Sequence, residues 1–113
     1  MQIVGKTQRK KFKNSDCCTA FEYPMNDSDI NGAIIELSGR YPKNGFAVNE
    51  ICKEMGYVIS GSGKIVVKNK EYLIAEGDLI LIQPNEKFYW QGNMKMFMPC
   101  APAWTPEQHR IIE

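Results

Sequence analysis

The chain has 113 residues, of which 43% are hydrophobic and 24% are charged, and its formal net charge is +1. These values are ordinary for one folded globular domain and exclude a disordered chain. Because the net charge is close to zero, no large field of one sign is available, so we expect neither nucleic acid nor an anionic membrane as a partner.

The N-terminal segment is basic rather than apolar. Its five clustered basic residues are Lys6, Arg9, Lys10, Lys11 and Lys13. This pattern predicts a solvated first strand, and the alternative is an arm that binds phosphate groups. The segment lacks the apolar stretch of a signal peptide, and no run in the chain approaches the ~20 apolar residues needed to cross a bilayer. We therefore expect a cytoplasmic protein.

The chain contains four cysteines, Cys17, Cys18, Cys52 and Cys100. In a cytoplasmic protein we expect all four to be reduced thiols. Neighbouring residues of a strand point to opposite faces, so Cys17 and Cys18 should not share a site.

Short apolar runs with turn residues between them occupy most of the chain. They lie at residues 33–35, 46–48, 57–59, 64–67, 72–74, 79–82, 88–90 and 96–98. The runs are as long as strands and rich in β-branched and aromatic residues, and their spacing of roughly 8–12 residues favours a sandwich or a barrel. Met94, Met96 and Met98 alternate with period two, which predicts a strand face filled by methionine. The sequence thus predicts a single all-β domain over residues 1–113.

Only the C-terminal segment has the pattern of a helix. Residues 105–108 place a threonine, a proline and a glutamine at the positions of a capping box. We expect a short helix over residues 105–113, at most about two turns long and docked through residues 111–112. His109, the only histidine, would lie in this helix, and Trp104 before it would cover the edge of the barrel.

Residues 39–93 resemble the two signature motifs of the cupin superfamily. The first motif runs glycine, H-x-H, three or four residues, glutamate, six residues, glycine. Here Glu54 is followed by six residues and then by Gly61, and residues 61–63 resemble the tight turn that ends this strand in cupins. The H-x-H pair is replaced by Ala47 and Asn49, or by Val48 and Glu50, depending on the gap.

The second motif is recognisable in residues 77–85, an apolar strand that follows the turn at residues 76–78 and ends at Pro84. In cupins a histidine follows. Counting from Gly77 places Phe88 at that position, and counting from Pro84 places Tyr89 there, so the register stays open by one residue.

The resemblance implies a double-stranded β-helix, the jelly-roll barrel of cupins. Most cupin enzymes bind a divalent metal through three histidines and a carboxylate. Of these ligands only Glu54 remains, so we expect no metal and no other cofactor. An unusual metal site formed by Cys52 and Glu54, which share a strand face, stays open as an alternative.

The barrel interior is the predicted site. A carboxyl group at Glu54 would have a raised pKa in apolar surroundings and could bind a ligand hydroxyl or transfer a proton. The candidate ligand-binding residues are Asn49, Cys52, Glu54, Phe88, Tyr89 and Trp90. Asn49, Glu54 and Tyr89 would form hydrogen bonds, while Phe88 and Trp90 would form an aromatic wall suited to sugars and other rings.

The leading hypothesis is therefore a metal-free protein that binds a small, possibly carbohydrate-like molecule in the barrel mouth. The alternative is a metal-independent isomerase, epimerase or lyase in which Glu54 and Tyr89 are the catalytic acid and base. A third hypothesis, a protein that only assembles or senses, predicts a barrel filled by its own side chains. We also expect a homodimer, because a small sheet leaves edges and apolar faces to be covered. The side chains expected to form the dimer interface are those of Ile34, Ile35 and residues 88–98.

Overall fold

The computed structural model describes all residues from 1 to 113, and every regular element longer than three residues is a strand. The elements are η1 (Lys6–Gln8), β1 (Lys10–Ser15), β2 (Cys18–Glu22), β3 (Asn31–Tyr41), β4 (Phe46–Asn49), β5 (Lys53–Val67), β6 (Lys70–Ala75), β7 (Leu79–Ile82), β8 (Lys87–Ala101), η2 (Pro106–Gln108) and β9 (His109–Ile112). The predicted all-β class is confirmed.

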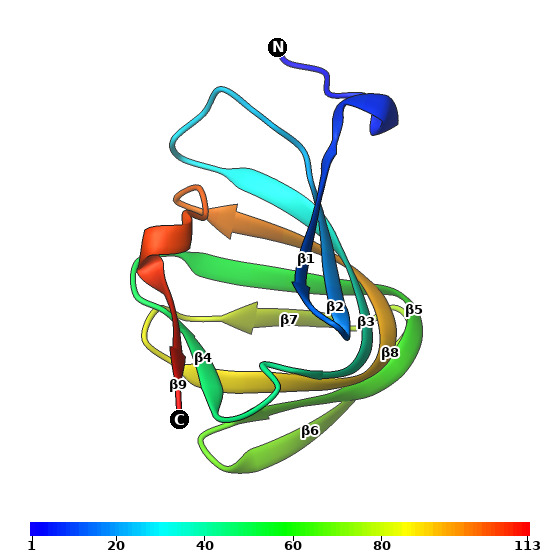
Figure 1. Ribbon diagram of the computed structural model, residues 1–113, viewed down its shortest axis with the longest axis vertical. Coiled ribbons are helices and arrows are strands. Elements are labelled where there is room, and N and C mark those ends of the chain that lie inside the picture. The colour runs from blue at the N-terminus through cyan, green and yellow to red at the C-terminus, as the bar shows by residue number, and fades with distance from the viewer.

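The nine strands form one antiparallel sheet. One path through it runs β1-β2-β3-β8-β4-β9, and β5 pairs with β8 as well as with β6 and β7. The long strands β3, β5 and β8 bend around the same side of the molecule, so the sheet curls into a half-barrel (Figure 1). The cupin-like architecture implied by the two motifs is therefore present.

The curl depends on a close approach between β5 and β8. Gly63 lies opposite Gly92, and a Cβ atom on Gly92 would lie only 2.5 Å from the Cα atom of Gly63. The register of this pair also shifts between Val58 and Ser60. The prediction that residues 61–63 form a turn is wrong, because β5 continues through them. A bulge and a positive φ at Gly61 bend the strand without ending it.

The core lies on the concave side of the sheet. Its buried apolar members are Cys18, Leu37, Ala47, Val58, Ile65, Ile74, Ile82, Phe88, Trp90, Met94, Met96 and Met98. The three methionines of β8 are buried on one face, as their alternation predicted. Since strand side chains alternate in direction, the residues between these positions face the outside of the half-barrel.

The predicted C-terminal helix over residues 105–113 is wrong. The segment makes only the single 3-10 turn η2, and Thr105 gives no side-chain capping bond. Residues 109–112 instead pair with β4 as the strand β9. The reason is that β4 has an open edge, and a strand beside it satisfies backbone groups that a two-turn helix would leave unpaired. Of the two expected docking residues, Ile112 is half-buried and Ile111 is half exposed.

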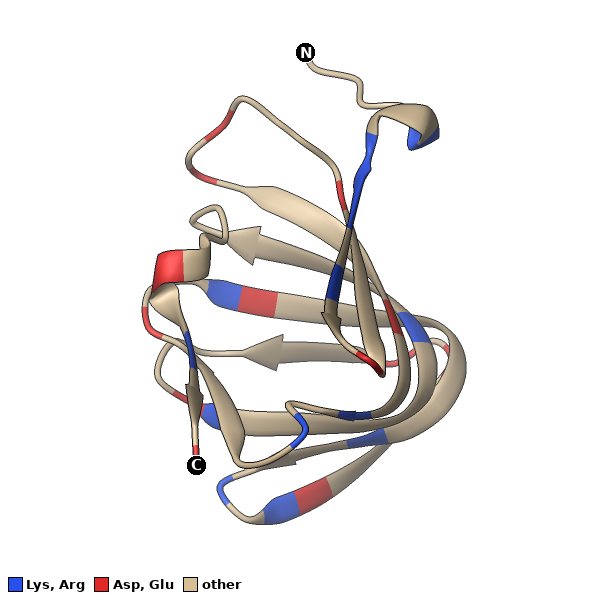
Figure 2. Cartoon of the chain, in the orientation of Figure 1, with Lys and Arg blue, Asp and Glu red and all other residues tan.

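Charged residues are spread over the molecule in both signs. Basic segments lie on η1 and along β1, and acidic and basic segments alternate elsewhere (Figure 2). The predicted basic first strand is β1, and its residues 10–14 are exposed. All four cysteines are free thiols. The structure contains no helix of the length and apolar character that a bilayer-spanning segment requires.

Candidate functional site

A cavity of about 420 Å³ lies inside the curl of the sheet. Strands β1, β2, β3, β5 and β8 contribute to its lining, together with Trp104 and His109 near the C-terminus, and most of the lining residues are apolar. Phe12, Phe88, Trp90 and Trp104 supply aromatic walls. The volume falls within the ~300–1,000 Å³ typical of sites for small molecules. The barrel is therefore not filled by its own side chains, as the third hypothesis required.

Polar side chains gather at one end of this cavity. We call them the polar cluster, and its members are Tyr41, Asn49, Glu54, Cys100, Gln108 and His109. Tyr41, Glu54, Cys100 and His109 line the cavity directly, whereas Asn49 and Gln108 lie behind them and are buried. None of the buried side-chain nitrogen and oxygen atoms in the structure lacks a hydrogen-bond partner.

Tyr41 and His109 form a pair at the cavity surface. Tyr41 ends β3 and His109 begins β9, and the distance from Tyr41 Oη to His109 Nε2 is 2.9 Å. The two rings are stacked, and Trp104 packs against His109 with ring centroids 5.4 Å apart. Burial raises the pKa of Tyr41 to about 12 and lowers the pKa of His109 below its ordinary value. Both groups are therefore neutral near pH 7.

Asn49 connects this pair to the rest of the polar cluster. It lies at the end of β4 directly opposite His109 on β9. Its Oδ1 lies 2.8 Å from His109 Nδ1 and accepts a hydrogen bond from Gln108 Nε2 at 3.1 Å. Its Nδ2 donates to Glu54 Oε1 at 3.3 Å. Asn49 therefore positions both titratable side chains while having almost no contact with solvent.

Glu54 holds a carboxyl group in the cavity wall without a cationic partner. It takes part in none of the three ion pairs of the structure. Its carboxyl oxygens accept hydrogen bonds from Asn49 and, at 3.4 Å, from Cys100 Sγ. Burial raises the pKa of Glu54 above its ordinary value, and these two bonds only partly oppose that shift. A hydroxyl or N–H group of a ligand would supply a further donor to this carboxyl.

Cys52 and Cys100 lie close to Glu54, and Cys100 is its register partner on β8. Cys52 is completely buried and does not line the cavity. A hydrogen bond with Cys52 and burial together raise the pKa of Cys100, so Cys100 remains a thiol that can donate to the carboxyl. No group of three or more His, Cys, Asp and Glu side chains is arranged to hold a metal ion.

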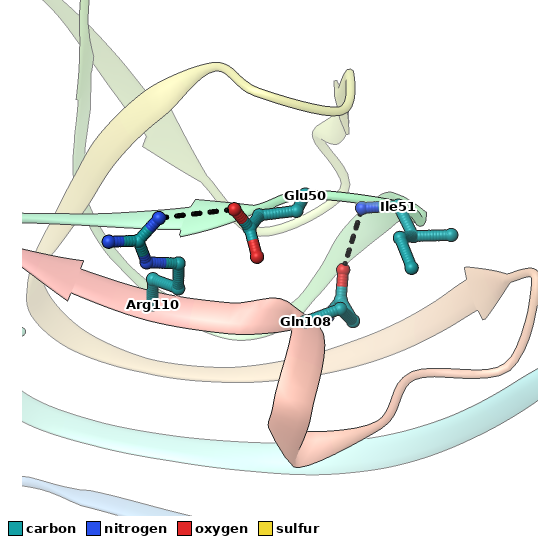
Figure 3. Close-up of polar contacts among 4 residues, drawn as sticks. All are labelled: Glu50, Ile51, Gln108 and Arg110. Carbon is teal, nitrogen blue, oxygen red and sulfur yellow. Dashed lines mark hydrogen bonds and ion pairs between the residues drawn. The ribbon is translucent and has the colours of Figure 1, made fainter.

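Gln108 holds the C-terminal segment against the loop that joins β4 to β5. Its Oε1 accepts hydrogen bonds from the backbone N–H groups of Ile51 at 3.0 Å and Cys52 at 3.2 Å, the first of which is drawn in Figure 3. On the outer side Arg110 reaches Glu50 at 3.2 Å (Figure 3). The polar cluster is thus assembled only when β9 is in place beside β4.

Besides Glu54, three charged residues line the cavity: Lys10, Glu22 and Asp27. Lys10 of β1 and Glu22 of β2 are register partners, and both line the cavity. Burial raises the pKa of Glu22, and the nearby Lys10 partly offsets this shift.

The residues predicted from the sequence are only partly brought together. Glu54, Phe88 and Trp90 line the cavity, and the rings of Phe88 and Trp90 meet edge to face with centroids 6.2 Å apart. Phe88 is buried and lines the cavity, whereas Tyr89 does not line it, so the strand position that faces inward is Phe88 rather than Tyr89. Asn49 and Cys52 lie behind the lining and reach the cavity only through their neighbours.

Tyr89 lies outside the cavity. Its ring packs against Phe46, with centroids 5.9 Å apart, and the guanidinium carbon of Arg40 lies 3.8 Å from the centroid of the Tyr89 ring. Because side chains alternate along β8, the inward positions of its two neighbours place Tyr89 on the opposite face. The structure therefore does not bring Glu54 and Tyr89 together as an acid/base pair.

Sequence reasoning missed the contribution of Tyr41 and His109 to the site. His109 is the only histidine in the chain, but the helix expected there hid its strand pairing with Asn49. Tyr41 lies outside the apolar runs and carries no motif. The one available signal was that His109, the only histidine, lies outside both cupin motifs and had no structural role in the predicted fold.

A family model described as the AraC-like ligand-binding domain matches residues 33–91 of this chain. A search of curated proteins by sequence gives no match.

The fold is similar to those of several solved structures. A variant of Streptomyces Pac13 with uridine has a TM-score of 0.89 at 19% identity, covering 100% of this chain and 92% of that chain. Pac13 is described as a unique nucleoside dehydratase. Ectoine synthase from P. lautus has a TM-score of 0.75 at 16% identity, with 100% and 91% covered. An RmlC-like cupin from Shewanella frigidimarina has a TM-score of 0.73 at 13% identity, with 91% and 92% covered. At these identities the likeness is one of fold.

Proposed function

We propose, from the premise that this chain belongs to the family of AraC-like ligand-binding domains, that it binds a small molecule with several hydroxyl or amide groups inside its curled sheet. The observation that carries this proposal is the cavity of about 420 Å³, which joins aromatic walls to the polar cluster at one end. A rigid cavity of this kind gives affinity through its apolar walls and orientation through a few polar groups.

The chemistry of the lining supports a nucleoside-like or sugar-like ligand. The faces of Trp90 and Trp104 suit a planar ring or the apolar face of a sugar. Glu54 offers acceptor oxygens to ligand hydroxyl or N–H groups, and no lysine or arginine forms an ion pair with it. The similar fold of Pac13, which has been solved with uridine, supports testing nucleosides first.

We further propose that binding needs no metal. The cavity retains the carboxylate of a cupin metal site, Glu54, but none of that site's three histidines. The one histidine present uses both ring nitrogens in hydrogen bonds to Tyr41 and Asn49. A ligand would therefore be held by side chains and ring contacts alone.

Thermal unfolding in the presence of a defined panel tests the proposal. The panel contains uridine, cytidine, adenosine, D-ribose, dihydroxyacetone and D-erythrulose, each measured with and without EDTA. A ligand present at about 100 times its Kd stabilises the folded state by about 2.7 kcal/mol, which corresponds to a rise in Tm of roughly 10 °C for a chain of this size. We expect at least one member to raise the Tm equally in both conditions.

Two variants locate the binding. Ala33→Leu adds bulk to a residue that lines the cavity and should abolish the shift, whereas Ile34→Leu changes the neighbouring residue, which is not in the lining, and should leave it unchanged. If only added metal ions stabilise the protein, or if Ala33→Leu responds to the panel as the wild type does, this function is wrong.

A further inference from the structure

Two backbone N–H groups fix the direction of the hydrogen bonds that link Gln108, Asn49, His109 and Tyr41. The N–H groups of Ile51 and Cys52 can only donate, so the Gln108 atom between them is its oxygen. The other end of the Gln108 amide is therefore its NH₂ group, which faces Asn49 and requires an oxygen there. This fixes the orientation of Asn49 as well, with its own NH₂ group toward Glu54.

The same reasoning fixes the tautomer of His109. Asn49 Oδ1 can only accept, and it lies 2.8 Å from His109 Nδ1, so Nδ1 carries the proton. In the neutral ring Nε2 is then a bare acceptor, and its partner at 2.9 Å, the phenol of Tyr41, is the donor. The buried amides thus hold His109 as a neutral base whose free nitrogen is directed at Tyr41. Both residues line the cavity, so a ligand bound in it would contact the Tyr41 and His109 side chains.

We propose that the cavity is an active site in which His109 and Tyr41 act as one acid/base pair that moves a proton on a bound hydroxylated ketone or aldehyde. This inference rests on the proposed function, because it requires that the cavity bind a small molecule. Asn49 and Gln108 are positioning residues, since they act through His109 and do not reach the ligand. The lowered pKa of His109 keeps the imidazole neutral near pH 7 and therefore able to accept a proton.

The proton transfer balances without a further reactant. A C–H bond next to the ligand carbonyl breaks, its proton goes to Tyr41 Oη, and the Tyr41 proton moves to His109 Nε2. The electron pair of the broken bond stays on the ligand as an enolate. The imidazolium then returns a proton through Tyr41. Return to the same carbon gives an epimer or the original substrate. Return to the former carbonyl carbon gives an isomer when the proton of the adjacent hydroxyl group moves to the enolate oxygen, so that this hydroxyl becomes the new carbonyl. Neither an oxidant nor a reductant is consumed.

The ligand class follows from what this step requires. A carbonyl group is needed to stabilise the electron pair, and a hydroxyl group on the adjacent carbon would donate to the Glu54 carboxyl, which has no cationic partner. General acid/base pairs contribute typically ~10²–10⁴-fold to a rate. We therefore expect His109→Gln and Tyr41→Phe each to slow proton transfer by at least ~10²-fold.

The first test reads the histidine directly. His109 is the only histidine, so ¹⁵N-labelled histidine gives one pair of ring signals in the NMR spectrum of the whole protein. We expect the Nδ1–H tautomer in the wild type, and a change at Nε2 in Tyr41→Phe that is absent from Tyr72→Phe, an exposed tyrosine on β6. An Nε2–H tautomer would overturn the inference, whether or not any ligand binds.

The second test measures exchange of carbon-bound protons in D₂O with dihydroxyacetone and D-erythrulose as probes. We expect the wild type and Tyr72→Phe to accelerate deuterium uptake next to the carbonyl, and His109→Gln and Tyr41→Phe to lose this acceleration while retaining the wild-type Tm shift with the probe. Probes that raise the Tm without exchanging, or nucleosides that raise it while neither ketone does, would overturn the acid/base pair but leave the binding function standing. If no member of the panel raises the Tm, the binding function itself is wrong.

Discussion

At the scale of single residues, Glu54 is a carboxyl group in the cavity wall that has no cationic partner. Burial raises its pKa above the ordinary value of 4.5. For a carboxyl with a raised pKa in the folded state, stability is greatest below the unfolded-state pKa and is lost as the pH rises through the folded-state pKa. The folded protein should therefore lose stability through this group as the pH rises above about 4.5.

Glu54→Gln should keep the fold, because the two side chains are nearly the same shape, and should remove this loss. We expect the unfolding free energies of the variant and the wild type to be closest near pH 4. Toward pH 8 the unfolding free energy of the variant should become larger than that of the wild type. Urea denaturation across this range measures the difference. A difference that does not change with pH would contradict a shifted Glu54 pKa. The variant should also bind any identified ligand more weakly.

The donor atoms around the cavity also make a prediction about metal content. Transition metals prefer nitrogen and thiolate donors. Here both His109 nitrogens are engaged in hydrogen bonds, and the raised pKa of Cys100 favours its thiol form. Protein purified without added metal should contain far less than one equivalent of iron, manganese, nickel or zinc per chain, as elemental analysis would show. A stoichiometric metal that survives dialysis would contradict this and would favour a site at Cys52 and Glu54.

At the scale of elements, the pairing of β4 with β9 decides whether the site exists. This pairing places His109 opposite Asn49, and Gln108 ties the same segment to the loop between β4 and β5. The C-terminal segment is therefore part of the cavity wall and not a separate appendage.

Replacing Gln108 with leucine tests how much its hydrogen bonds to Ile51 and Cys52 stabilise the fold. The change leaves the N–H groups of Ile51 and Cys52 without an acceptor, and each unsatisfied buried donor costs roughly 1–3 kcal/mol. We expect a loss of about 2–4 kcal/mol in unfolding free energy by urea denaturation. Arg110→Ala is the matched control, because it breaks only the exposed pair with Glu50 and should cost less than about 1 kcal/mol. Equal losses of unfolding free energy in the two variants would show that the hydrogen bonds of Gln108 add no stability beyond that of an exposed ion pair.

At the scale of the whole molecule, the outer face of the half-barrel carries an apolar patch. It consists of Tyr57 on β5, Leu79 and Leu81 on β7, and Phe97 on β8, all partly exposed. Tyr57 is the register partner of both Leu79 and Phe97, so these side chains are neighbours. Ile35, Phe88, Trp90 and the three methionines, which the sequence suggested as interface material, instead face the cavity or the core.

We predict that a second copy of the chain covers this patch. A two-fold interface needs only one self-complementary surface, and large exposed apolar patches on a folded domain mark interaction sites. Light scattering at micromolar concentration should give twice the 12.9 kDa of one chain. Leu79→Asp should yield a folded monomer, while Leu73→Asp, on the exposed face of β6, should leave the dimer intact. A wild type that stays at the mass of one chain as its concentration rises would contradict the prediction.

What the sequence determined by itself was the class of the fold and the alternation of side chains along its strands. Period-two alternation follows from strand geometry and is a local property, so the apolar runs and the shared face of the three methionines of β8 could be predicted. Which of Phe88 and Tyr89 faces the cavity could not be predicted, because the motif spacing left the register open by one residue. The cupin motif spacing likewise located Glu54, because the glutamate and the glycine that follows it lie on one strand, β5.

Only the tertiary structure decided what stands next to Glu54. Tyr41, Asn49 and His109 are separated by up to 68 residues in sequence, and they meet because β9 adds to the edge of β4. Residues 105–108 carry a local helix signal, and the energy of pairing with an open strand edge, which depends on a partner some 60 residues away, outweighs it. Local pattern predicts which face a side chain takes. Long-range strand pairing determines which side chains share that face, and in this protein it creates the histidine–tyrosine pair.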